Sequence, residues 1–178
     1  MKYKTRKHPL FSACGLNCGL CSNFHLHTNG KFKCPGCAGE GFSDVHPSCG
    51  ILSCTQRKGF EFCFECDEFP CKKYVGWGDA DSFITHRNYI ADMEKAKQIG
   101  MEAYIAEQNE RVSMLQELLK KYNDGRRKTF FCLAVNILEL QDIKSVMSQI
   151  TDETEPKVVV RLFEETAAQK GILLKLRK

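Results

Sequence analysis

The chain has 178 residues, of which 43% are hydrophobic and 27% charged, as is normal for a globular protein. No apolar run has the length of a secretory signal or of a membrane span, so we expect a cytoplasmic protein without membrane contact. The formal net charge is +4, and two zinc ions, each bound by four thiolates with a net charge of about −2, would cancel it. Charge alone therefore indicates no polyanionic partner.

The cysteines are concentrated in the first half of the chain. Ten of the eleven lie between Cys14 and Cys71, and only Cys132 lies outside this block. Because the cytoplasm keeps thiols reduced, dense cysteines there indicate metal binding more than disulfides. An odd total also fits a complete disulfide framework poorly. Cys132, in the apolar stretch FFCLAV, is interpreted as a small buried hydrophobic residue.

The segment from Lys2 to Tyr74 shows no sustained helical period, because Gly, Pro and Cys recur too often. Such a segment cannot bury enough apolar surface by itself and needs cross-links to fold. Metal sites supply them, since the binding free energy of a structural zinc ion is folding free energy. We therefore predict an irregular, zinc-organised N-terminal module over residues 1–76, with small α+β structure at most.

Residues 77–178 are predicted to form a mostly helical region, which makes the fold class mostly α. Residues 128–140 fit a buried strand or a buried helix, and we favour helix because an amphipathic pattern continues over 140–150. Before these two stretches we expect a helix with Asp81 or Ser82 as its N-cap and Gly100 as its end, and a second helix over 101–122. After them we expect a helix over 157–170 and a short edge strand over 172–178.

Two CxxC pairs stand out in the cysteine block. Cys18 and Cys21 form the first, Cys34 and Cys37 the second, and twelve residues separate them. Two such turns at this separation typically supply the four thiolates of a zinc ribbon or a similar site.

A short internal repeat follows these pairs. His46, Cys49 and Cys54 match Cys63, Cys66 and Cys71 at a constant offset of seventeen residues. His46 stands where the second copy has a cysteine, as in an exchange of one zinc ligand for another. A solvent-exposed histidine before Pro47 is the alternative interpretation.

The block thus holds eleven candidate metal ligands, for which we expect at least two zinc ions and at most three. They are Cys14, Cys18, Cys21, Cys34, Cys37, His46, Cys49, Cys54, Cys63, Cys66 and Cys71. A simple partition places the two CxxC pairs on one ion and His46, Cys49, Cys63 and Cys66 on another. Cys14, Cys54 and Cys71 then remain for a third site completed by His25, His27 or water, although the spacing also allows interleaved sets.

The stretch CGLNCGLC, from Cys14 to Cys21, also has the CxxxCxxC spacing that holds the cluster of radical S-adenosylmethionine enzymes. Those enzymes usually have an aromatic residue where this chain has Leu20, and they need a strand–helix barrel for which the chain is too short and too helical. A plain iron–sulfur cluster, or an open metal site in a redox protein or enzyme, remains the alternative to structural zinc.

The cysteine block resembles an uncharacterised prokaryotic family, domain of unknown function 3795. The stretches that carry the resemblance are CGLNCGLC, KCPGC, CGILSC and FCFECDEFPCKKY, in that order, within roughly the first 75 residues. The resemblance places all ten cysteines of the block at the family's cysteine positions, whereas His46 departs from an expected cysteine. It implies metal binding and carries no established activity.

No phosphate loop or catalytic triad signature is present, so no catalytic residue is predicted. Four-thiolate zinc sites are coordinatively closed and organise structure. We therefore expect a zinc-binding recognition module, with a protein partner ahead of nucleic acid. The oligomeric state is not predicted.

Overall fold

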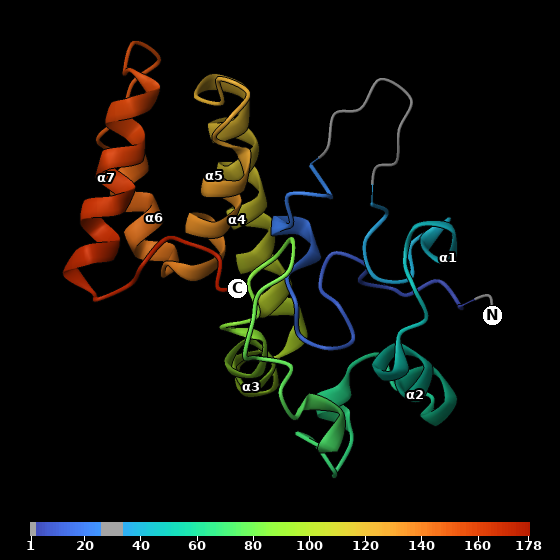
Figure 1. The fold of residues 1–178 in the computed structure, drawn as a ribbon. Helices are drawn as coiled ribbons and strands as arrows, with labels where there is room; N and C mark the ends of the chain where they lie inside the picture. Colours follow the sequence, from blue (N-terminus) through green and yellow to red (C-terminus); the bar gives the residue numbers. More distant parts are fainter. Residues whose placement is uncertain (1–2, 26–33) are drawn as a thin grey trace.

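Most of the chain packs around helix α4 (Met101–Lys121) in the computed structural model, which describes residues 3–25 and 34–178. Helix α4 contacts α3, α5, α6 and the short 3-10 helix η1 (Cys18–Leu20). The ribbon places α5, α6 and α7 on one side of α4 and the cysteine-rich segment on the other (Figure 1). The longest helix is thus the support for both halves of the chain.

Seven α-helices, three 3-10 helices and no strand are found in residues 3–25 and 34–178. This confirms the expected mostly α fold with an irregular cysteine-rich N-terminal part. None of these helices combines the length and the apolar character that crossing a membrane requires. Besides η1 and α4 the elements are α1 (Phe42–Val45), α2 (Gly50–Lys58), η2 (Cys63–Glu65), η3 (Lys72–Tyr74), α3 (Tyr89–Ile99), α5 (Lys128–Ile137), α6 (Leu140–Met147) and α7 (Pro156–Gln169).

Hydrophobic periodicity located most of the C-terminal helices correctly. Helix α4 begins and ends within one residue of the predicted range, and α7 covers the predicted helix over 157–170. The ambiguous stretch over 128–140 is a helix, α5, and the amphipathic stretch after it forms α6. Cys132 is buried in the core, as expected.

Helix α3 begins six or seven residues later than predicted from Asp81 or Ser82 as its N-cap. The carboxylate of Asp81 does not cap a helix, because it accepts hydrogen bonds from the His86 amide at 2.8 Å and from the Arg177 guanidinium at 2.9 Å. It is fully buried in these contacts. Asn88 occupies the N-cap position, whereas Gly100 ends the helix as predicted.

The predicted edge strand over 172–178 was wrong, since the segment has no strand pairing in the structure. Side chains hold it instead. The Arg87 guanidinium donates to the Leu173 carbonyl at 2.7 Å, and the Arg177 amide donates to Asp81 at 2.8 Å. The chain therefore ends in an irregular segment that is fixed to the loop before α3.

Helix α2 lies inside the segment predicted to lack helices. Its buried residues, Ile51, Leu52 and Thr55, span little more than one turn, so no period was visible in the sequence. The Cys49 sulfur accepts a hydrogen bond from the Leu52 amide at its N-terminus, and Gly59 ends it with φ +76°.

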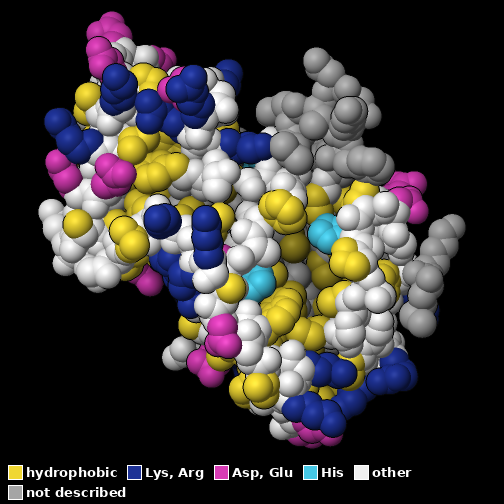
Figure 2. Space-filling model, viewed as in Figure 1, with side chains coloured by type: hydrophobic (Ala, Val, Ile, Leu, Met, Phe, Trp, Pro, Cys, Tyr) yellow, Lys and Arg dark blue, Asp and Glu magenta, His cyan; other side chains and the backbone are white. Residues whose placement is uncertain are grey.

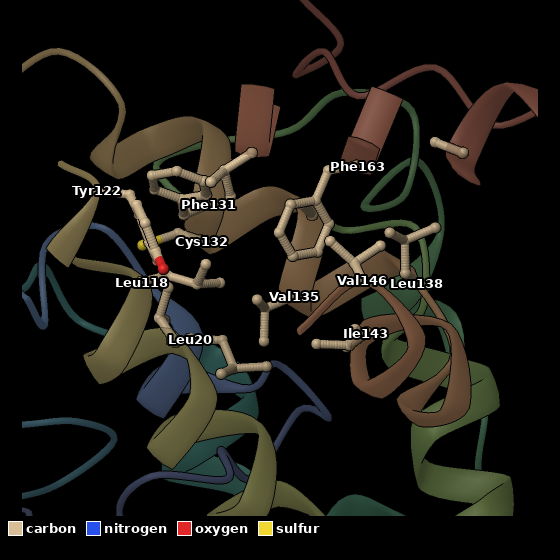
Figure 3. Packing of buried hydrophobic residues seen from close by; sticks show 14 residues of the cluster. Leu20, Leu118, Tyr122, Phe131, Cys132, Val135, Leu138, Ile143, Val146 and Phe163 are labelled. Carbon is tan, nitrogen blue, oxygen red and sulfur yellow. The ribbon is translucent and has the colours of Figure 1, made fainter. Parts of the chain in front are cut away.

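Two large hydrophobic clusters cross the predicted boundary between residues 76 and 77. The first is built by α4–α7, with Phe131 and Phe163 facing each other at 6.2 Å, and it receives Leu20 from η1 (Figure 3). The second joins Phe11 and Cys14 to Met93 and Tyr104 of α3 and α4. The N-terminal part therefore shares its cores with the helices.

A buried amide ties the stretch CGLNCGLC to three helices at once. The Asn17 side chain, 5% exposed, donates to Asp92 of α3 at 2.8 Å and to the Asn136 side chain of α5 at 3.4 Å. Its oxygen accepts a hydrogen bond from the Tyr104 hydroxyl of α4 at 3.1 Å. Every polar atom of this amide is thus paired, which fixes the position of the neighbouring cysteines.

Asp92 in this network makes stability depend on pH. Burial raises the pKa of Asp92 to about 7, although the Arg111 charge and the hydrogen bond from Asn17 lower it. Because the folded pKa exceeds the unfolded value, this group stabilises the fold fully below about pH 4, and the contribution is lost as pH rises to about 7.

We therefore predict that Asp92→Asn flattens the decline of the free energy of unfolding between about pH 4 and 7, which for one proton is at most about 1.4 kcal/mol per pH unit. Urea unfolding across this range measures it. Glu94→Gln, at an exposed position on the same helix, is the control and should keep the wild-type slope. An unchanged slope in the Asp92→Asn protein would contradict the prediction.

Candidate metal centres

The stretch CGLNCGLC folds as a tight loop followed by η1. The Ser12 amide donates to the Leu16 carbonyl at 2.9 Å, and the Ser12 hydroxyl accepts from the Leu16 amide at 2.8 Å. Gly15 has φ +92°, and a Cβ at this position would lie 2.2 Å from the Tyr89 carbonyl oxygen. Only glycine allows the loop to approach α3 this closely.

Seven of the predicted ligands form what we call the first thiol cluster. They come from three segments of the chain and are Cys14, Cys18, Cys21, Cys34, Cys37, His46 and Cys49. Charge on the Cys37 sulfur raises the pKa of both Cys14 and Cys18, and charge on Cys34 raises the pKa of Cys18 and Cys21. Burial is the larger cause of each of these pKa shifts, and Cys18, Cys37 and Cys49 also pack in one hydrophobic cluster. The two CxxC pairs thus lie near one another, and their sharing of one ion stays a prediction.

His46 enters this cluster through Cys34. Its Nε2 lies 3.1 Å from the Cys34 sulfur, and its ring stacks on Phe42 at 4.5 Å. Burial lowers the pKa of His46, which favours the neutral imidazole that a metal requires. The histidine is nonetheless exposed to solvent, as the alternative interpretation expected, while its ring nitrogen contacts the Cys34 sulfur.

Cys14 is the most deeply embedded thiol of the cluster. Burial, together with the charge on Cys37, raises the pKa of Cys14 to about 12. Its sulfur lies 2.9 Å from the Ser12 hydroxyl, and its side chain belongs to the hydrophobic cluster shared with α3 and α4. Charge on Cys49 also raises its pKa, so Cys49 is its neighbour in the same cluster.

The remaining four cysteines form the second thiol cluster, defined as Cys54, Cys63, Cys66 and Cys71. They line one cavity of about 330 Å³, together with Lys58 and Tyr74. Burial, together with the charges of Cys71, Cys54 and Cys66, raises the pKa of Cys63 to about 11. The cluster draws on α2, η2 and the turn before η3.

The structure divides the seventeen-residue repeat between the two clusters. His46 and Cys49 lie in the first cluster, whereas Cys54 joins the whole second copy. The simple partition that placed His46 and Cys49 with Cys63 and Cys66 therefore does not match the geometry. Helix α2 is the reason, since it begins after Cys49 and carries Cys54 away to the other cavity.

His25, proposed to complete a third site, has a different partner in the structure. Nε2 of His25 lies 2.7 Å from the Gly19 carbonyl oxygen, which occupies that nitrogen. His27 lies outside the described residues. Cys14 is in the first cluster, and Cys54 and Cys71 are in the second.

In neither cluster do the described side chains have the arrangement that binds a single ion. Within residues 3–25 and 34–178, no three His, Cys, Asp or Glu side chains converge tightly enough to hold one metal ion. No disulfide is present among the cysteines, all of which are free thiols. The arrangement is therefore two groups of neighbouring reduced thiols.

Two residues beside the thiols were not predicted from the sequence. Lys58 donates to the Cys66 sulfur at 3.2 Å, and the Tyr74 hydroxyl is a hydrogen-bond partner of Cys63. Lys58 is four residues after Cys54, so a predicted helix at α2 would have placed both on one face. Tyr74 had no comparable signal in the sequence.

Comparison with known proteins supports the resemblance seen in the cysteine block. The family model described as "Protein of unknown function (DUF3795)" matches residues 10–76, which include all ten clustered cysteines. Neither the curated proteins nor the solved structures give a match. The family match identifies the N-terminal segment and assigns it no activity.

We predict that Gly15→Ala lowers the free energy of unfolding by about 3 kcal/mol, because the added Cβ meets the α3 backbone and φ is positive. Gly50→Ala is the matched control, since a Cβ there meets no atom within 4 Å. It should be neutral or slightly stabilising. Denaturant unfolding of both variants measures the difference, and equal midpoints would refute the packing argument.

Proposed function

We propose that the N-terminal part of the chain, residues 1–76, is a metal-binding module with at least two metal centres, one in each thiol cluster, and that the first thiol cluster binds structural zinc. The observation that carries this proposal is that six cysteines and His46 from three separate segments lie near one another: Cys18, Cys37 and Cys49 share one hydrophobic cluster, and Nε2 of His46 lies 3.1 Å from the Cys34 sulfur. The family that matches this segment has no assigned activity, so the proposal rests on the chemistry of these residues.

Electrostatics supports a cation in the first cluster. Burial and the neighbouring sulfurs raise the pKa of Cys18 well above its usual value, and burial raises that of Cys37. Thiolates at such a place need a positive charge, and a bound divalent cation deprotonates its thiol ligands outright. Arg6, the nearest buried cation, acts on Cys37 but already donates to the Phe11 and Glu61 carbonyls.

Zinc is the ion that the donor set favours. Cysteine sulfur and histidine nitrogen are its typical ligands, and a closed tetrahedral site organises structure without activating water. Seven donors exceed the four that one ion needs, which leaves room for a further ion, as the ligand count predicted. We also propose the cytoplasm as the compartment of the protein, because the cytoplasm keeps thiols reduced and available to a metal.

The role we infer for the module is recognition of a protein partner. Val75 and Phe83, which follow the last clustered cysteine, are 84% and 68% exposed and offer apolar surface to such a partner. A nucleic acid is the weaker alternative, because each four-thiolate centre adds negative charge. Binding to an oligonucleotide that falls steeply with salt concentration would favour nucleic acid over protein.

Protein purified without added metal should contain at least one zinc ion per chain. We expect a strong chelator to remove it and to lower the melting temperature by about 10 °C or more, since structural zinc contributes to folding. Elemental analysis and thermal unfolding measured by circular dichroism test this.

Two substitutions locate the zinc. Cys37→Ser should lose the ion of the first cluster, whereas Cys132→Ser, which changes a thiol of the helical core, should retain it. Less than one zinc ion per wild-type chain, with a melting temperature unaffected by the chelator, would remove the proposal without any variant.

A further inference from the structure

The four cysteines of the second thiol cluster line a cavity, whereas the four ligands of a zinc site contact a single ion. Zn–S bonds of about 2.3 Å bring four tetrahedral thiolates to about 3.8 Å from one another, so their sulfurs touch. Cys54, Cys63, Cys66 and Cys71 line a cavity of about 330 Å³, far more space than a single ion occupies. A larger group than one ion is needed to contact all four sulfurs.

We propose that this cavity binds a [4Fe–4S] cluster, with one of the four cysteines bound to each iron. Four thiolates are the ligand set of such a cluster, which itself fills the space between them. The inference deepens the proposed function, because it assumes that the second thiol cluster is one of the two metal centres. It does not depend on zinc in the first.

The walls of the cavity suit an inorganic cluster that must be kept from water. Phe60, Phe69 and Tyr74 line it, and the rings of Phe69 and Tyr74 meet edge to face at 5.4 Å. Tyr74 is buried, and its hydroxyl is a hydrogen-bond partner of the Cys63 sulfur. These rings give part of the cavity an apolar wall, and the hydrophobic surroundings of a bound cluster help to set its reduction potential.

Positive side chains complement the charge of the cluster. A [4Fe–4S] core of charge +2 with four thiolates carries a net charge of about −2. Lys58 donates to the Cys66 sulfur at 3.2 Å, and Lys72 and Lys73 also line the cavity. Glu68 is the one acidic residue in the lining, and it is paired with Lys58 at 3.5 Å. Figure 2 shows Lys and Arg side chains gathered over α2 and the segment after it.

The sequence pointed to a different place for a cluster. The CxxxCxxC spacing of Cys14, Cys18 and Cys21 was the candidate motif, yet the Cys21 sulfur lies 3.9 Å from the Phe83 carbonyl and Cys14 is embedded against α3. The spacing from Cys54 to Cys71 matches neither common ferredoxin pattern. Only the cavity that these four residues share reveals them as a set.

Anaerobic expression with added iron, or reconstitution of the full chain with ferrous iron and sulfide, tests the inference. The expected result is about four iron and four acid-labile sulfide ions per chain, with absorption near 400 nm that dithionite bleaches. An electron paramagnetic resonance signal of the reduced protein identifies the cluster type in the wild-type chain, without any substitution.

Variants assign the site. Cys66→Ser should lose iron and sulfide and keep the zinc of the first cluster, whereas Cys37→Ser should keep iron and lose zinc. Lys58→Met should retain four irons and shift the reduction potential to a more negative value, because a hydrogen bond to sulfur is removed. Lys120→Met, at an exposed position of α4, should leave the potential unchanged.

The failures of the two proposals are distinguishable. Iron-free protein whose second cluster binds zinc, shown by zinc lost in the Cys66→Ser protein, would overturn the iron–sulfur inference and leave a metal-binding module. Protein with neither metal at either cluster would overturn both. Iron that survives Cys66→Ser but not Cys37→Ser would move the cluster to the first site and contradict the assignment.

Discussion

The paired amide of Asn17 is the interaction on which the arrangement of this protein depends. It lies between Cys14 and Cys18 and joins Asp92, Tyr104 and Asn136, which belong to three different helices. Burying a polar side chain costs free energy unless each of its polar groups is hydrogen-bonded. These three partners therefore fix the position of the loop against the helices. The irregular cysteine segment thereby takes its geometry from the helices.

The two thiol clusters are separate but share a wall. Burial raises the pKa of Tyr74, and charges on both Cys63 of the second cluster and Cys14 of the first raise it further. This tyrosine also packs on Tyr89 at 5.6 Å, at the start of α3. A change of charge in one cluster is therefore felt at a residue that contacts the other. The helical half of the chain supports this shared wall and adds no ligand to either cluster.

Hydrophobic contacts with the helices contribute to the stability of the N-terminal segment. Phe11, Phe62 and Ile51 are buried against α3 and α4, which gives the segment a core that its own composition does not supply. The sequence argument that cross-links must fold this segment by itself thus overstated the need. The helices supply part of the apolar surface that the segment lacks.

The sequence by itself determined the helical C-terminal half and the identity of the thiols, because both follow from local pattern: a 3.6-residue period marks α4 and α7, and CxxC turns mark sulfur pairs. Only the tertiary structure decided which cysteines lie in the same thiol cluster. Helix α2 separates Cys49 from Cys54, and its single buried turn left no periodic signal. Likewise, the pairing of Asp81 with Arg177 moved the start of α3, since contacts between residues 96 positions apart depend on how the chain closes and not on its neighbours in sequence.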